Sequence, residues 1–508
     1  MSLLRAMSTV AGLTALSRIA GFIRDILTAA ILGAGPIGDA FFVALKLPNF
    51  FRRVTAEGAF SVSFVPVYSE ALEQKGRDEA DEFARNAFVW MLGILSVFVI
   101  IIMAAMPWVL YAIAPGFIGD EMRYDLAVEL SRITFPYLLF MSLTALLGGV
   151  LNALNRFAPF AFAPVLFNLC LIAALLLNGF FETAGHALAW GILAAGMIQL
   201  VWLVICAKRQ GFAFKMRRPR YDERTRRVFR LMGPGVIGAG VMHINLFADL
   251  ILASFLQTGA ISYLYYADRL NQLPLGVVGI AVGTALLPML SKAMSGERYE
   301  EARDLFNKAL IYCLLLALPA ALALAAIPKT LIGGLFQRGA FEAQDTVQTS
   351  YVLMAYALGL PAYISIKVFS TVHWARQDTI TPVKIAVVAT LSNIVLSIIL
   401  IQFMGVSGIA LATGLTGWMQ FILHMRHLKD HPAAVLDKNF RRSAAWIVVW
   451  SVIMAISLVL LDNYIFGGMS DLPKMVLLVA FGLCIYGAGI FFSGIFSLSS
   501  LKKLAIKK

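Results

Sequence analysis

The sequence predicts an all-α polytopic membrane protein with fourteen transmembrane helices. Hydrophobic residues make up 60% of the 508 residues and charged residues only 14%, and the mean hydropathy is +0.81. Soluble domains contain about 45–50% apolar and about 25% charged residues. The composition therefore excludes a soluble enzyme, a disordered protein and a fibrous protein, and the chain must keep most of its surface in lipid.

Fourteen apolar segments are long enough to cross a bilayer, which takes about 20 residues. In chain order they are 8–33, 38–68, 86–113, 126–154, 160–180, 186–207, 230–257, 261–290, 307–328, 347–371, 382–403, 406–427, 443–462 and 474–497. The first is not a secretory signal peptide, because Arg18 and Arg24 interrupt its apolar run. Pro48 and Pro136 lie inside the second and fourth segments, where helix breaks are tolerated if the backbone lines a cavity or packs against protein.

The Lys and Arg residues predict the orientation of the chain. Most fall in loops on the side of the N-terminus, with a dense group in Lys208–Arg230. The positive-inside rule places those loops, and both termini, in the cytoplasm. The opposite side receives only Arg123, Lys329, Arg338 and Lys474. The net charge of +13 thus reflects topology and attraction to anionic lipid headgroups, and we expect no nucleic-acid binding.

Charged side chains also lie inside the predicted spans, where each Arg, Lys or Asp costs about 2.5–3.5 kcal/mol. They are Arg18, Arg24, Lys46, Arg52, Arg53, Arg132, Arg269, Lys367, Asp25, Asp39, Glu57, Asp249 and Asp268. Basic residues outnumber acidic ones, so pairing within the set leaves cations over. We therefore expect a water-filled cationic cavity; the alternative is a set of structural ion pairs, such as Arg53 with Glu57 or Arg24 with Asp25.

The spacing of these residues favours a shared interior. Ser17 and Arg24 are two helical turns apart, so their side chains share one stripe of the first span. In the second span, Lys46, Asn49, Arg53 and Glu57 follow helical spacing with Arg52 beside them. In the eighth span, Asp268, Arg269, Asn271 and Gln272 fall within one turn.

An internal repeat relates the second and eighth spans. They align without gaps, and the matched pairs are Asn49 with Asn271, Ala59 with Ala281, Pro66 with Pro288 and Ser69 with Ser291. The repeat predicts two six-helix lobes, an N-lobe at 1–225 and a C-lobe at 226–428, an arrangement typical of transporters. Residues 429–508 hold the two extra C-terminal spans and a basic cytoplasmic tail.

Three segments resemble the MurJ (MviN) family. They are SRIAGFIRD (Ser17–Asp25), GDAFFVALKLPNFFRRVTAEGAFSVSFVPV (Gly38–Val67) and YYADRLNQLPLGVVGIAVGTALLPMLS (Tyr265–Ser291). Members of this family are lipid II flippases of the bacterial inner membrane, within the multidrug/oligosaccharidyl-lipid/polysaccharide exporter superfamily. The resemblance covers essentially the whole chain. It implies a V-shaped pair of lobes, an alternating-access cycle, and a groove beside the last two spans for the undecaprenyl tail.

The resemblance also implies the site residues. The arginines of the family's cavity match Arg18, Arg24, Arg52 and Arg269, to which Ser17 and Asn49 add polar contacts. Asp25, Asp39, Arg53, Glu57 and Asp268 are the expected ion-pair and gating residues. The chemistry agrees, because the planar guanidinium of Arg binds phosphate through two hydrogen bonds. Lipid II carries a pyrophosphate, so a cationic cavity suits its headgroup.

Some members of the family hold a sodium ion, for which Asp249, Asn393 and Ser397 are weak candidates here. Ser397 stands where a second carboxylate is expected, and a hard cation prefers anionic oxygen. His424, His427 and His431 have a spacing that could bind a metal, but their position favours interfacial residues. No P-loop, HExxH or GxSxG motif is present, so no cofactor is expected.

Other functions remain as alternatives. A flippase for another polyprenyl-linked glycan fits the same features, whereas a drug exporter would favour an acidic cavity for cationic drugs. A membrane-embedded glycosyltransferase needs carboxylates near the outer face, and the longest outer loop, Pro328–Thr346, carries only Glu342 and Asp345. We expect a monomeric transporter and not an enzyme, with lipid II and membrane lipids as partners. Its energy source, membrane potential or sodium, stays open.

Overall fold

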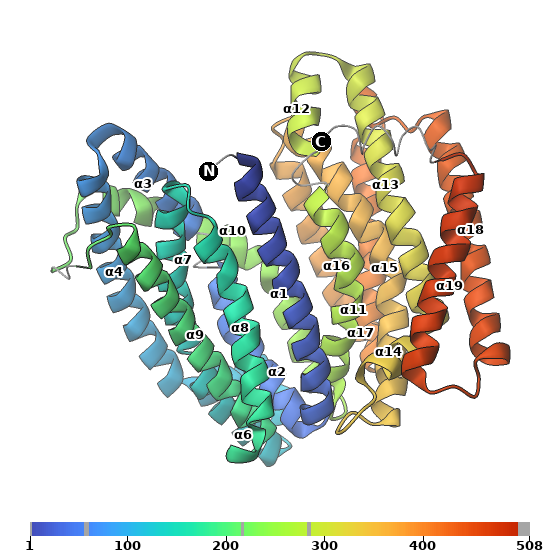
Figure 1. Cartoon of the computed structure of the whole chain (residues 1–508), viewed down its shortest axis with the longest axis horizontal. Coiled ribbons are helices and arrows are strands. Elements are labelled where there is room, and N and C mark those ends of the chain that lie inside the picture. Colours follow the sequence, from blue (N-terminus) through green and yellow to red (C-terminus); the bar gives the residue numbers. More distant parts are fainter. Residues whose placement is uncertain (1–2, 55–59, 215–217, 282–285, 496–508) are drawn as a thin grey trace. The chain divides into compact units, whose positions relative to one another are not determined.

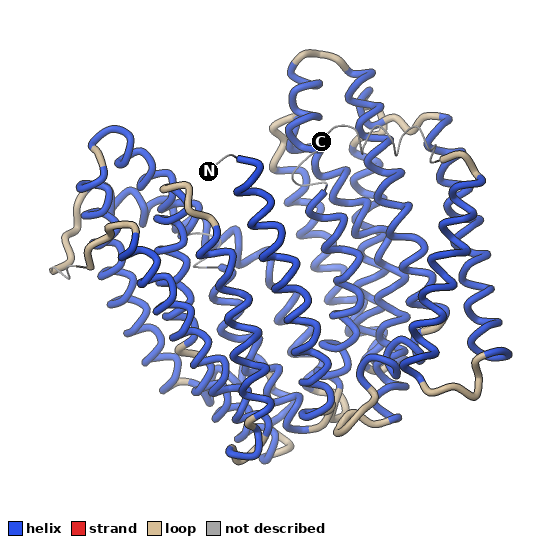
Figure 2. Tube along the Cα trace, viewed as in Figure 1, coloured by secondary structure: helices blue, strands red, loops and turns tan. Residues whose placement is uncertain are grey.

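The computed structural model describes residues 3–54, 60–214, 218–281 and 286–495. Within these ranges the chain consists of helices joined by short loops, without strands (Figure 2). The all-α prediction is therefore confirmed for the described residues. The helices cluster into two compact units, one formed by Met1–Ser262 with Gly339–Phe341, the other by Tyr263–Arg338 with Glu342–Lys508.

The first unit contains the helices up to α10 (Figure 1). They are α1 (Leu3–Leu32), α2 (Pro36–Phe51), α3 (Ser61–Lys75), α4 (Arg77–Ala104), α5 (Met106–Ile113), η2 (Pro115–Phe117), α6 (Glu121–Thr134), α7 (Tyr137–Ala153), α8 (Ala158–Leu176), η3 (Asn178–Phe180), α9 (Ala184–Arg209) and α10 (Glu223–Ser254). Helix α1 packs along α8, α2 packs on α6, and α9 contacts both α7 and α8.

The second unit contains the remaining helices. They are α11 (Ala260–Ala281), α12 (Leu287–Ser295), α13 (Tyr299–Ala326), α14 (Pro328–Phe336), α15 (Ala343–Ala375), α16 (Ile380–Met404), α17 (Val406–His427), η5 (Pro432–Ala434), α18 (Lys438–Leu460), η6 (Leu461–Ile465) and α19 (Asp471–Phe492). Helix α15 is central and contacts α12, α13, α14 and α17. The predicted C-terminal appendage is the pair α18–α19, which packs on α13 and α14.

Ten helical segments in the described part of the chain are long and apolar enough to span a membrane. They match predicted spans three to six and nine to fourteen. The remaining segments correspond to α1, α2–α3, α10 and α11–α12, which carry most of the charged residues of the predicted spans. The total of fourteen stays a prediction, as does the division at residue 225, which rests on the internal repeat.

The fourth predicted span is interrupted, because it divides into α6 and α7 beside Pro136. Proline removes a backbone hydrogen bond and its ring clashes with the preceding turn, so this break is expected. In the second predicted span, Pro48 lies inside α2, which ends at Phe51, and α3 begins at Ser61. Gly58 and Glu57 lie outside the described residues.

Aromatic packing stabilises the first unit around α3, α4 and α7. Phe60, Phe64 and Phe83 are buried and their rings stack, with centroids 5.0 Å apart for Phe60 and Phe64 and 5.4 Å apart for Phe64 and Phe83. Tyr68 continues the stack and donates a 2.8 Å hydrogen bond to Asp81. The Tyr68 hydroxyl, buried in this core, therefore has a partner, as a buried polar group requires.

Candidate functional site

The two predicted cavity arginines of α1, Arg24 and Arg18, differ in burial. Arg24 donates to Asp25 Oδ1 from Nη2 at 2.6 Å and from Nε at 3.2 Å. Its Nη1 donates to Asn168 Oδ1 at 2.9 Å. Arg24 and Asp25 are mostly buried, with side-chain exposures of 12% and 6%, whereas Arg18 is exposed. The predicted contact between Arg24 and Asp25 is thus present as a partly buried ion pair.

Asn168 of α8 is a polar residue that the sequence reasoning missed. Its Nδ2 donates to the Ser17 carbonyl at 2.9 Å and lies 3.4 Å from Ser17 Oγ. The same side chain therefore contacts the backbone of α1 at Ser17 and the guanidinium of Arg24, two helical turns further along the same stripe. The available signal was its position as an amide near the middle of the apolar fifth span.

Just after the end of α2, Arg52 is positioned by the side-chain amide of Asn49. Arg52 Nε donates to Asn49 Oδ1 at 3.2 Å, while Asn49 Nδ2 donates to the Leu45 carbonyl at 2.8 Å. The amide thus links the guanidinium to the helix backbone one turn earlier. Arg53 is exposed on the same helical turn, and its predicted partner Glu57 lies outside the described residues.

Arg269 and Asp268 lie on α11 in the second unit. The Arg269 guanidinium carbon lies 4.4 Å from the centroid of the Tyr265 ring, a cation–π contact. Gln272 donates a hydrogen bond to Asp268. The four predicted cavity arginines are divided between the two units, so their convergence on one cavity stays a prediction.

Asp39 is the centre of a buried polar network in the first unit. It is 1% exposed and accepts hydrogen bonds from the Gly259 backbone at 2.8 Å and from the Ser262 backbone and hydroxyl at 2.9 and 2.8 Å. Arg123 Nη1 lies 3.8 Å from Asp39 Oδ2. We call these four residues, Asp39, Arg123, Gly259 and Ser262, the latch.

Arg123 is the basic partner of Asp39, a contact that the sequence does not predict. The sequence predicts Arg123 on the outer side of the membrane and Asp39 among the ion-pair and gating residues. In the structure Arg123 is 4% exposed and donates to Thr258 Oγ1 at 3.0 Å and to the Ser254 carbonyl at 3.2 Å. Its guanidinium carbon also lies 4.0 Å from the Phe117 ring centroid. Asp39 thus pairs with Arg123, and the segment between α10 and α11 is tied to α2 and α6.

A second close contact joins segment Gly339–Phe341 to the end of α1. The Ala340 amide donates to the Ala30 carbonyl at 2.8 Å. A Cβ atom at Gly339 would lie 2.1 Å from Ala30 O, and one at Gly33 would lie 2.5 Å from Ala340 O. Both glycines have positive φ, +59° at Gly339 and +68° at Gly33. Only glycine fits this close approach without strain.

Two of the weak sodium candidates, Asp249 and Asn393, have hydrogen-bond partners. Asn245 Nδ2 lies 3.4 Å from Asp249 Oδ2 on α10. In the second unit, Asn393 Nδ2 donates to Thr413 Oγ1 and Thr416 Oγ1, both at 3.3 Å. Asn393 Oδ1 and Ser397 Oγ are buried without a hydrogen-bond partner among the described residues. A cation at these two oxygens stays a prediction.

One of the histidines near the end of α17, His424, does not have the exposed position expected of an interfacial residue. His424 is fully buried, and its ring centroid lies 5.3 Å from that of His373 on α15. His373 Nδ1 lies 3.2 Å from Asp378 Oδ2 in the following loop. The Thr381 backbone N–H donates to Asp378, which lowers the pKa of that carboxyl to about 2. The interfacial interpretation is therefore wrong for His424.

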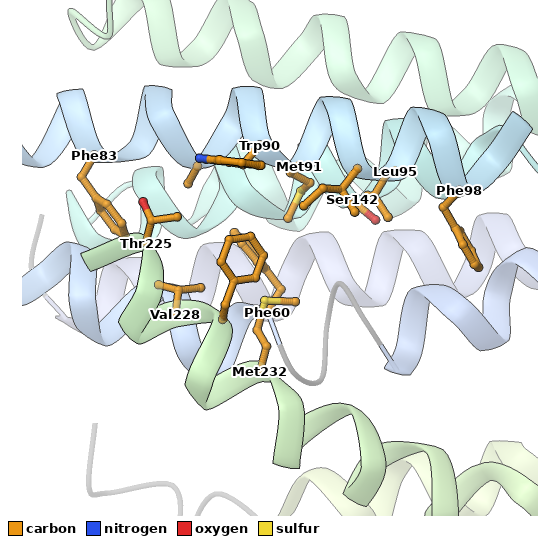
Figure 3. Close-up of a pocket in the computed structure, with 13 residues that line it drawn as sticks. Phe60, Phe83, Trp90, Met91, Leu95, Phe98, Ser142, Thr225, Val228 and Met232 are labelled. Atoms are coloured by element: carbon orange, nitrogen blue, oxygen red, sulfur yellow. The ribbon is translucent and has the colours of Figure 1, made fainter. Parts of the chain in front are cut away.

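An apolar cavity of about 270 Å³ lies within the first unit (Figure 3). Side chains of α4, including Trp90 and Met91, face Phe60, Val228 and Met232 across it. Ser142 and Thr225 supply the hydroxyl groups of the lining, and Trp90 contributes its indole ring. The walls offer no charged side chain, so this cavity is not a site for a pyrophosphate.

Comparison with solved structures defines the class of protein. The fold matches an inward-facing multidrug resistance MATE family transporter of the MOP superfamily, with a TM-score of 0.70 over 84% of this chain and 98% of that chain, at 14% identity. This likeness shows the fold alone. Together with the apolar helices and the charged residues held among them, it defines a polytopic membrane protein with the fold of a MOP-superfamily transporter.

The family model described as lipid II flippase MurJ matches residues 28–477. The chain belongs to this family. It is 39% identical to the probable lipid II flippase MurJ of Rhizobium tropici over 468 residues, which cover 91% of this chain and 88% of that protein. It also matches a solved structure of lipid II flippase MurJ in an inward closed conformation, with a TM-score of 0.81, 27% identity, and 96% and 99% coverage of this chain and that chain.

Proposed function

We propose that this chain flips lipid II from the cytoplasmic to the periplasmic leaflet of a bacterial inner membrane. Membership of the lipid II flippase MurJ family is the observation that carries the proposal. The chemistry of the chain supports it, because basic residues on apolar helices suit an anionic headgroup attached to a lipid tail. The protein is a multi-pass membrane protein, and we propose that it works as a monomer.

The substrate's pyrophosphate is bound by Arg18, Arg24, Arg52 and Arg269, with Ser17 and Asn49 as polar contacts. Arg24 supports this role best, since Asp25 and Asn168 hold its guanidinium at a fixed place on α1. Asp25 is the counter-charge of the empty site, and substrate phosphate takes its place. The exchange conserves the charge balance of a buried arginine, which is costly to leave uncompensated.

The latch and the Gly339–Phe341 contact gate the periplasmic side. The first unit ends at Ser262, and the short segment Gly339–Phe341 also belongs to it. Both places are hydrogen-bonded close to the α1–α2 turn. The Ser262 amide donates to Asp39, and the Ala340 amide donates to the Ala30 carbonyl. These bonds form and break as the two lobes alternate between inward- and outward-open states.

The termini, the C-terminal helices and the other charged residues have roles in the same proposed transport cycle. Both termini and the basic Lys208–Arg230 segment face the cytoplasm, in agreement with the positive-inside rule. Fourteen helices form two six-helix lobes in a V-shaped arrangement, and α18–α19 guide the undecaprenyl tail. Asp268 and Arg53 act with Asp25 and Asp39 as ion-pair partners during the cycle, and Glu57 has the same proposed role.

The test is replacement of the native flippase in cells by variants of this chain, with a probe for lipid II exposed on the outer leaflet. Wild type and Arg303→Ala, an exposed residue of α13, should restore exposure. Arg24→Ala should insert but fail to restore it, and Arg24→Lys should restore it in part, since Lys keeps the charge and loses the planar fork. Full activity of Arg24→Ala would reject the phosphate role. A wild-type chain that leaves lipid II exposure unchanged would reject the proposed function.

A further inference from the structure

Three potential metal ligands meet in the first unit, apart from the proposed substrate residues. They are Glu129 on α6, Glu182 in the loop before α9, and His186 in the first turn of α9. One ligand atom of each lies within 4.8 Å of the other two. The residues are thus brought together from separate elements, which neither α6 nor α9 could do alone.

His186 is poised to ligate through one ring nitrogen. The residue is only 6% exposed. Its Nδ1 lies 2.9 Å from Thr183 Oγ1, the N-cap residue of α9. Its Nε2 is buried without a hydrogen-bond partner among the described residues. A hydrogen bond at one ring nitrogen commonly fixes the tautomer so that the other nitrogen can bind a metal.

The distance between the nearest side-chain atoms of His186 and Glu129 equals the distance between two ligand atoms of one metal ion. His186 Nε2 lies 3.3 Å from Glu129 Oε1, yet the two atoms do not form a hydrogen bond. Tetrahedral zinc with bonds of about 2.0–2.1 Å separates its ligand atoms by about 3.3–3.4 Å. The side chain of Glu182 is exposed, so it can close the third position by a change of rotamer.

We propose that Glu129, Glu182 and His186 bind a divalent transition metal of the zinc type. An imidazole combined with carboxylates favours such ions over calcium or magnesium, which prefer all-oxygen ligands. Two carboxylates also balance the charge of the ion. The ligands line a cavity of about 760 Å³, which leaves room for water at a fourth position.

The surroundings agree with a structural role for the ion. Asp125, one turn before Glu129, and Arg132 also line the cavity. Arg132 Nε donates to the Met103 carbonyl at 3.2 Å and is held to that neighbouring helix. A metal at this place would tie the loop that follows α8, through Glu182, to α6, through Glu129.

The test uses the full-length, tag-free protein in detergent after treatment with a chelator. Zinc is titrated in competition with a fluorescent zinc indicator, and cobalt is titrated while its visible absorption is recorded. The double variant Glu129→Gln/Glu182→Gln keeps His186 and the side-chain shapes. Glu121→Gln, an exposed residue of the same helix, is the matched control. Zinc bound elsewhere, for example at the exposed His427, persists in the double variant and is subtracted.

We expect wild type and Glu121→Gln to bind one zinc that the double variant binds at least about tenfold more weakly. Cobalt should give visible bands of a four-coordinate site only in the first two proteins, and zinc should raise their Tm. Equal zinc affinity in the double variant would overturn the proposal. A second result would also overturn it: zinc does not raise the Tm of wild type, and the double variant has a lower Tm than wild type in the presence of chelator. The three residues would then stabilise the protein as an ion pair without a metal. Equal competition by calcium would also contradict it.

Discussion

Removal of the Asp39 charge tests whether the latch holds the segment between α10 and α11. The perturbation is Asp39→Asn, which keeps the volume of the side chain. The carboxylate accepts from Gly259, from Ser262 and from the Ser262 hydroxyl. An amide can accept at one position only, and its NH₂ group would face the N–H of Gly259 or of Ser262.

The magnitude follows from burial. Arg123 would lose the buried carboxylate 3.8 Å away and keep Asp120, which is 42% exposed and 3.9 Å away. Breaking a buried ion pair by removing one partner costs about 3–5 kcal/mol. Each 1.4 kcal/mol is about a factor of ten in an equilibrium constant. A cost near the lower limit, about 3 kcal/mol, therefore opens the segment about a hundredfold more often.

Amide hydrogen exchange measures this opening directly, because the Gly259 and Ser262 amides donate to Asp39. A peptide that covers residues 255–266 should exchange about a hundredfold faster at those amides in Asp39→Asn. Asp125→Asn, which removes an exposed carboxylate from α6, is the control and should leave the rate unchanged. Unchanged exchange in Asp39→Asn would refute the latch, and unchanged flipping with faster exchange would refute its gating role.

Three further predictions concern other parts of the chain. Gly339→Ala should destabilise the protein by about 2–4 kcal/mol, from positive-φ strain and from the clash with Ala30 O; Gly119→Ala, where an added Cβ meets nothing within 4 Å, should leave the Tm unchanged. Burial, and to a smaller extent Arg376, lower the pKa of His431 from its ordinary value of 6.5, so its contribution to stability is present above that pH and is lost as pH falls; His431→Asn should flatten the decrease of Tm below about pH 6.5, and an unchanged slope would contradict the assignment. Flipping should stop when an ionophore collapses the membrane potential at constant sodium, since moving the two charges of a pyrophosphate outward across 100 mV gains roughly 4–5 kcal/mol; loss only on sodium removal, or on Asn393→Ala, would favour the sodium alternative.

The sequence predicted the local features well. Composition indicated an all-helical membrane protein, and Pro136 marked a real break between α6 and α7. The neighbouring Arg24 and Asp25 form an ion pair, which the sequence offered as the alternative to a cationic cavity. Each of these depends on residues close together in the chain. Helical periodicity and the cost of charge in lipid are therefore enough to predict them.

The long-range contacts could not be predicted in the same way. Arg123 lies in the first turn of α6, just before the predicted fourth span, and only packing shows that its guanidinium is buried beside Asp39 and Phe117. Asn168 is 144 residues from Arg24 along the chain, so no spacing rule relates them. The packing of the helices determines which distant residues come into contact. A single sequence contains no local pattern that shows this packing.

The central claim is that this chain itself moves lipid II and that Arg24 contacts its pyrophosphate. The most direct measurement is the transfer of lipid II between leaflets of vesicles that contain only the purified protein and an imposed membrane potential. Lipid II that reaches the far leaflet is detected with an impermeant probe. The account predicts transfer by wild type, reduced transfer by Arg24→Lys, and transfer at the protein-free rate by Arg24→Ala. Wild-type vesicles that do not exceed protein-free vesicles, or Arg24→Ala vesicles that match wild type, would contradict it.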